Sequence, residues 1–149
     1  MAAGLSIKAE NIDRFTKNFE AAVRKLTRPD DFVPTIRIDA EIRFDDISPE
    51  LIDEIETLQP FGSGNSEPLF MSKNIEIVSS KIVGAKHRRM MIRQSDSWAG
   101  QSFQAIHFNI DPGKPAPKSF DKIAFRLRWN RWNGKQNSQM IIEETESRR

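Results

Sequence analysis

The sequence predicts an α+β protein in which a helix–strand–helix segment precedes a five-stranded antiparallel β-barrel. Three features predict it: an apolar stripe at helical spacing near the N-terminus, a strictly alternating segment after it, and five short strand-like runs in the second half. Five short strands expose their edges unless they close on themselves. A small closed or nearly closed barrel is therefore the economical arrangement.

The first predicted element is a helix over residues 10–28. Its apolar side chains recur at helical spacing and form one stripe. Pro29 ends the helix, because a proline disfavours the helical conformation in the residue before it. The stripe consists of Ile12, Phe15, Phe19, Ala22, Val23 and Leu26.

Residues 35–44 alternate between apolar and polar, which predicts a strand with one solvated face. Ser48 and Pro49 then predict the start of a second helix, with the serine as N-cap and the proline at the first helical position. This helix has an acidic outer face and ends at Pro60. The loop at 61–68 is the best boundary candidate, so we expect an N-terminal part over 1–60, a linker loop, and the barrel over 69–149.

The five strands of the barrel are predicted over residues 75–83, 87–93, 101–108, 121–129 and 138–143. The connection at 109–119 contains three prolines, so we expect it not to be helical. Asn133 and Gly134 predict a tight hairpin between the last two strands, because both residues tolerate positive φ.

Composition excludes several protein classes. The chain of 149 residues has no cysteine, which rules out disulfides, thiolate metal sites and a cysteine nucleophile. No apolar run is long enough to span a membrane, and the N-terminus lacks the features of a signal peptide. We therefore expect a soluble cytoplasmic protein without a membrane partner.

Charge is distributed unevenly along the chain. Residues 1–69 contain 8 Lys and Arg against 14 Asp and Glu, a net charge of −6, whereas residues 70–149 contain 15 against 7, a net charge of +8. One interpretation is that the basic half binds nucleic acid. The other is that two oppositely charged faces attract each other.

Residues typical of catalysis are missing. Neither His87 nor His107 lies near a carboxylate at metal-ligand spacing, and the adjacent aspartates at 30–31 and 45–46 stand where turn and cap residues are common. No serine or threonine stands in a nucleophile motif. The sequence predicts no catalytic residue, metal site or cofactor in this chain.

Two basic clusters are the candidate nucleic-acid-binding residues. In five-stranded Greek-key barrels, the face of strands two and three and the loops after strands one and four bind oligonucleotides, and both clusters fall mostly there. Trp132 is the better candidate for stacking on a base, Trp129 is in phase with the core, and Trp98 could serve either purpose. The clusters are Lys86, His87, Arg88, Arg89 and Arg93 in the first, and Arg126, Arg128, Arg131 and Lys135 beside Trp132 in the second.

Four passages resemble the RecJ family of bacterial single-strand-specific exonucleases. Residues 2–5 (Ala-Ala-Gly-Leu) resemble the end of the family's Gly-Gly-His-x-x-Ala-Ala-Gly motif. Residues 38–42 and 51–58, followed by Pro-Phe-Gly-Ser-Gly-Asn-Ser-Glu-Pro at 60–68, resemble the segment before its oligonucleotide-binding (OB) fold. Residues 83–87 and 129–134 resemble the basic turn and the late Asn-x-Trp-x-Gly turn of that fold. The stretch at 60–68 is the most specific.

The resemblance implies that residues 1–60 end the domain associated with an Asp-His-His catalytic domain (DHHA1-type), and that 69–149 form an OB-fold domain. The family's metal-dependent 5′→3′ hydrolysis would belong to the parent protein, with Mn²⁺ or Mg²⁺ in a domain that these residues do not contain. The implied function of this chain is to grip single-stranded DNA in DNA repair and recombination. The alternative is a protein-interaction module that docks single-strand-binding protein or another repair partner.

Overall fold

The computed structural model describes residues 4–147 and divides into two compact units at Ile36 and Arg37. The first unit holds helix α1 (Ile12–Leu26) between two short 3-10 helices, η1 (Ala9–Asn11) and η2 (Pro29–Phe32). The first predicted helix is thus confirmed. None of the residues of α1 is buried, so its apolar stripe is uncovered within this unit. The Ala2–Ala3 part of the first family passage lies outside the described residues.

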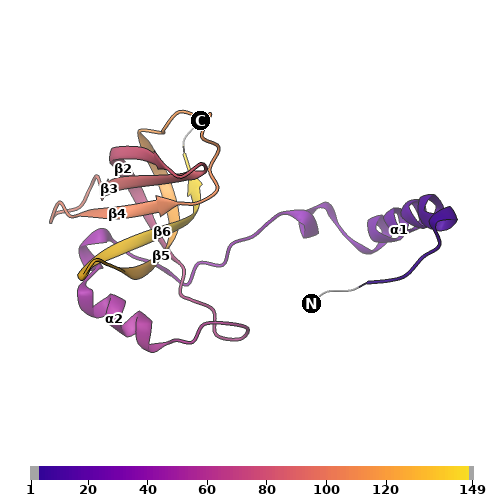
Figure 1. Cartoon of the computed structure of the whole chain (residues 1–149), viewed down its shortest axis with the longest axis horizontal. Helices are drawn as coiled ribbons and strands as arrows, with labels where there is room; N and C mark the ends of the chain where they lie inside the picture. Colours follow the sequence, from indigo (N-terminus) through magenta and orange to yellow (C-terminus); the bar gives the residue numbers. More distant parts are fainter. Residues whose placement is uncertain (1–3, 148–149) are drawn as a thin grey trace. The chain divides into compact units, whose positions relative to one another are not determined.

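The second unit is a closed barrel with OB topology (Figure 1). Its strands are β2 (Phe70–Val83), β3 (His87–Gln94), β4 (Ser102–His107), β5 (Ser119–Trp132) and β6 (Lys135–Glu146). The ring runs β2–β3–β4–β6–β5 and closes through the antiparallel pairing of β2 with β5. All pairs of the ring are antiparallel except β4 with β6, which is parallel, a departure from the purely antiparallel barrel that we expected.

All five predicted barrel strands are present, and β2, β5 and β6 run several residues longer than the sequence predicts. Asn133 and Gly134 have φ values of +48° and +72°, so they form the tight turn that the sequence predicts between β5 and β6. Residues 109–118 contain no helix, as their prolines indicate.

The strand predicted over residues 35–44 is mostly wrong. Only β1 (Ala40–Glu41) forms, in parallel with the start of β2. The Ile42 N–H donates to the Met71 carbonyl at 2.9 Å, but from Ile75 onward β3 occupies this edge of β2. The apolar residues of the alternating segment do not share one buried face, because Ile36 is exposed whereas Phe44 is fully buried.

Helix α2 (Pro49–Thr57) covers one end of the barrel, and the β4–β5 connection lies at the other end (Figure 1). Ser48 caps the helix through its Oγ, which accepts from the Leu51 N–H at 3.3 Å, as the sequence predicts. Phe44 enters the core and meets Phe103 and Phe125 edge-on, at centroid distances of 5.2 and 6.3 Å.

Residues 37–60 therefore pack with the barrel, and the compact unit starts well before the loop at 61–68 that we expected to separate two domains. That loop is itself held in place. Asn65 Nδ2 donates to the carbonyls of Leu58 and Pro60 at 2.8 and 3.0 Å, and Glu67 is 7% exposed.

Candidate nucleic-acid interface

The outer face of β2, β3 and β4 carries a groove of about 340 Å³. Lys81 on β2 lies directly opposite Arg89 on β3, so both side chains stand on the same face of the sheet. Like charges in that position destabilise a strand pair. Both residues are exposed, and neither forms an ion pair with any carboxylate of residues 4–147. The groove is also lined by Ser79, Ser80, Met90, Met91 and Gln104.

The residues of the first predicted cluster have different surroundings in the structure. Lys86 is exposed in the β2–β3 turn and, with Arg89, remains available to a ligand. His87 is engaged by its neighbours, because its ring meets Phe108 edge-on at 4.9 Å and its Nδ1 accepts from the Asn109 N–H at 3.3 Å. Arg93 pairs with Glu76 across the strands at 2.7 Å.

Arg88 points into the barrel rather than onto this face. It is 6% exposed and in phase with the buried Met90 and Ile92 of β3. Its Nη2 donates to the Lys114 carbonyl at 3.0 Å. The sequence placed Arg88 in a surface cluster because it stands between basic neighbours, but alternation along a strand turns it to the opposite face.

The three arginines of the second predicted cluster pair with carboxylates, mostly from the acidic half of the chain. Arg128 Nε donates to Glu67 Oε1 at 2.6 Å, and Arg128 Nη2 bonds the other oxygen of the same carboxylate. Arg126 donates to the Glu67 carbonyl at 3.0 Å and to Glu143 at 2.8 Å. The hydrogen bonds that Arg128 donates to Glu67 raise the pKa of Arg128 above its ordinary value, against the opposing effect of desolvation.

Arg131 makes a two-pronged contact with Glu56 of α2, at 2.8 and 2.7 Å. This hydrogen bond lowers the pKa of Glu56 and raises that of Arg131. The contacts of Arg126, Arg128 and Arg131 agree with the second interpretation of the charge asymmetry, in which opposite charges attract each other within the protein.

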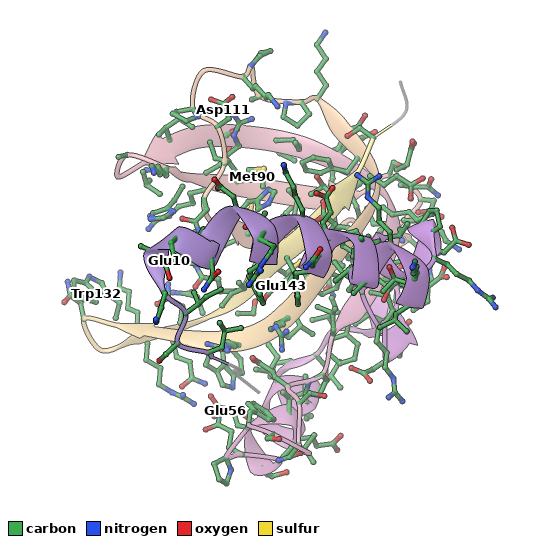
Figure 2. The ribbon with its side chains drawn as sticks, turned by 90° about the vertical axis from the view of Figure 1, so that its right-hand side faces the viewer. Glu10, Glu56, Met90, Asp111, Trp132 and Glu143 are labelled. Atoms are coloured by element: carbon green, nitrogen blue, oxygen red, sulfur yellow. The ribbon has the colours of Figure 1, made fainter. Side chains whose placement is uncertain are left out.

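Aromatic side chains add two exposed rings. Trp132 is 74% exposed at the tip of the β5–β6 hairpin, which projects from the barrel in Figure 2, and Lys135 is its cross-strand partner. Trp129 is half-buried, as expected, and its Nε1 donates to Asp53 at 2.7 Å.

Trp98, for which the sequence favours neither a core nor a contact position, is 85% exposed, more than Trp132. Asp45 holds its loop by accepting hydrogen bonds from Ser97 Oγ and from the N–H groups of Trp98 and Ala99. Burial would raise the pKa of Asp45, but these bonds and Arg43 lower it. The ring is therefore displayed on an anchored loop.

Residues 4–147 contain no group of three or more His, Asp or Glu side chains placed to hold a metal ion. Within the same residues, no helix is long and apolar enough to cross a membrane.

Comparison with known proteins identifies the barrel. Residues 38–144 match the family model described as the RecJ OB domain. The chain is 27% identical over 148 residues to the single-stranded-DNA-specific exonuclease RecJ of Bacillus subtilis and 24% identical over 145 residues to that of Dickeya dadantii. These two matches include 97% and 96% of this chain but only 18% and 25% of the length of the relatives.

The fold is also found in a solved structure. The crystal structure of RecJ from Thermus thermophilus in complex with Mn²⁺ matches 98% of this chain with a TM-score of 0.73 at 18% identity. The match covers 20% of that protein. The chain thus spans about a fifth to a quarter of the proteins that it resembles.

Proposed function

The chain belongs to the RecJ OB domain family, and from this premise we propose that it is the single-stranded-DNA-binding part of a RecJ-like exonuclease of DNA repair and recombination. The hydrolysis of single strands from the 5′ end, and the Mn²⁺ or Mg²⁺ that supports it, belong in this proposal to a catalytic domain of the parent protein outside residues 1–149. Residues 4–36, which belong to a compact unit separate from the barrel, would be part of the domain that precedes the barrel.

The observation that carries the proposal is that Lys81 and Arg89, which line the groove, lie opposite each other and form no ion pair within residues 4–147. Elsewhere on the barrel, Arg93, Arg126, Arg128 and Arg131 each form an ion pair with a carboxylate, whereas Lys81 and Arg89 face each other without one in the described part of the chain. Two cations held opposite each other gain most from an anionic ligand, such as successive phosphates of a nucleic-acid backbone.

The remaining features suit a single strand better than a duplex. Met91 and Gln104 in the groove offer an apolar and a hydrogen-bonding contact to an unstacked base. The exposed rings of Trp98 and Trp132 offer stacking platforms, each worth about 1–3 kcal/mol per base. Lys86, in the turn after β2, extends the positive charge along the same two strands.

Salt dependence tests the mode of binding. We expect fluorescence anisotropy of a labelled oligo-dT to report binding that weakens with salt. The log–log slope is expected to be about −1.4 to −2.1, because each neutralised phosphate contributes about −0.7 on single strands and Lys81, Arg89 and Lys86 supply two to three contacts. A slope near zero would contradict a phosphate-based grip.

A double substitution tests the location of the site. Lys81→Ala with Arg89→Ala is expected to weaken oligo-dT binding by at least about tenfold at low salt, since two phosphate contacts are lost. The matched control is Lys17→Ala with Lys25→Ala on α1, which removes the same charge from another unit. Equal losses in both variants would mean that net charge alone, rather than this face, drives binding.

A second candidate function is protein docking, including the docking of single-strand-binding protein. The exposed apolar stripe of α1 favours it, because Phe19 is 57% and Leu26 85% exposed. Protein docking without nucleic-acid binding predicts no anisotropy change with oligo-dT even at low salt.

A further inference from the structure

The end of the barrel opposite α2 holds a pocket of about 220 Å³ that is separate from the outer face. It lies beneath the β4–β5 connection, whose Asp111 is labelled in Figure 2 at the end of the barrel away from Glu56 of α2. The pocket has room for several water molecules, and so for a tetrahedral anion. Its polar lining comes from Arg88, His107, Asp111, Lys114, Thr145 and Ser147.

Arg88 is the unusual member of this lining. It is 94% buried, since only 6% of it is exposed, yet it forms no ion pair with any carboxylate of the described residues. Its Nε is buried and has no hydrogen-bond partner within residues 4–147. A buried charge without a partner is costly, and a buried unsatisfied donor adds to that cost. The site is incomplete without an acceptor.

The neighbours of Arg88 shape the site for an anion. His107 lies directly opposite Arg88 in the β3–β4 ladder, so both side chains turn to the inside of the barrel. The Lys114 carbonyl accepts from Nη2 and fixes the orientation of the guanidinium, while the Nε–H beside it has no partner within residues 4–147. Asp111 is exposed at the rim, and its Oδ1 accepts the Gly113 N–H at 3.0 Å.

We propose that this pocket binds a phosphoryl group, with the guanidinium of Arg88 as its main ligand and His107 as a second hydrogen-bonding group. A planar guanidinium bonds two oxygens of a phosphoryl group at once, which suits a single buried arginine. Burial, the largest effect, and the nearby Arg88 lower the pKa of His107, against the carboxylates of Glu144 and Glu143. A bound anion would reverse part of that effect. This site goes beyond the single-strand grip and does not depend on the groove of β2–β4.

Inorganic phosphate is the probe. In a ¹H–¹⁵N spectrum of the whole chain, millimolar phosphate is expected to shift the Arg88 Nε–H resonance and the backbone amides of residues 107, 110, 111, 113 and 114, relative to sodium chloride of equal ionic strength. Shifts that chloride reproduces, or no shifts, would overturn the proposal.

Substitutions assign the effect to the pocket. Arg88→Gln is expected to weaken phosphate binding by at least about tenfold, because the charge-assisted contact is lost. Arg93→Gln is the matched control: it removes the same charge from the same strand, but faces outward and pairs with Glu76. Should Arg88→Gln not fold, His107→Ala, at the half-exposed opposite wall, is expected to weaken binding severalfold. Unchanged phosphate affinity in a folded pocket variant would refute the site.

Competition identifies the source of the phosphoryl group. If the pocket takes a phosphate of the DNA backbone, saturating phosphate is expected to weaken oligo-dT binding beyond the effect of chloride, and Arg88→Gln to remove that sensitivity. If phosphate binds but does not compete, the ligand is a free or small-molecule phosphate. The groove on β2–β4 is tested independently, because Lys81→Ala with Arg89→Ala leaves phosphate affinity unchanged.

Discussion

Phe44→Ala is expected to lower the free energy of unfolding of the barrel by about 3–5 kcal/mol, the usual cost of truncating a fully buried phenylalanine. Phe44 is 0% exposed and its ring meets both Phe103 and Phe125, on two different strands. No small side chain can replace these contacts without leaving a cavity. Urea unfolding followed by tryptophan fluorescence measures the loss, because Trp129 packs against the same core.

Phe19→Ala is the matched control, since it makes the same chemical change on α1, where the ring is 57% exposed. We expect it to leave the unfolding of the barrel unchanged. Equal stability of wild-type protein and Phe44→Ala would contradict the packing of residues 37–60 on the barrel, and would favour the boundary at 61–68 that the sequence suggests.

The strands of the barrel could be predicted because each strand buries one face, which makes apolar and polar residues alternate along the sequence. In β5, Phe125 and Leu127 point inward, whereas Arg126 and Arg128 point outward. Residues 35–44 also alternate between apolar and polar side chains, but there the pattern wrongly predicted a strand. Phe44 fits the alternating pattern because its side chain is buried in the core of the barrel. A strand also requires a neighbouring strand edge to pair with, and local periodicity does not reveal one.

The candidate site was predicted less well than the fold, because residue type does not reveal pairing. The sequence predicts a basic patch at Arg126 and Arg128. Local sequence does not reveal that both pair with Glu67, because Glu67 lies 59 and 61 positions away. The one available signal was Glu67 itself, in the most specific of the family passages. Lys81 lies outside both basic clusters of the sequence, and only the register of β2 with β3 brings it to Arg89.

Arg126→Ala with Arg128→Ala tests whether the β5 arginines serve structure or nucleic acid. We expect a loss of about 2 kcal/mol in the free energy of unfolding, because the buried Glu67 carboxylate loses its side-chain partners; this is less than for a fully buried pair, since Arg128 is half-exposed. Affinity of the folded variant for oligo-dT is expected to change by less than about threefold, since these arginines are already neutralised and screened.

A third substitution separates the two roles. Glu67→Gln, added to the double variant, removes the unpaired charge and is expected to restore about 1 kcal/mol of the lost stability, measured by urea unfolding. A DNA-binding role for these arginines predicts the opposite pattern: unfolding unchanged by the double substitution, oligo-dT affinity reduced by tenfold or more, and no recovery on adding Glu67→Gln. The buried position of Glu67 between the two guanidinium groups favours the structural role.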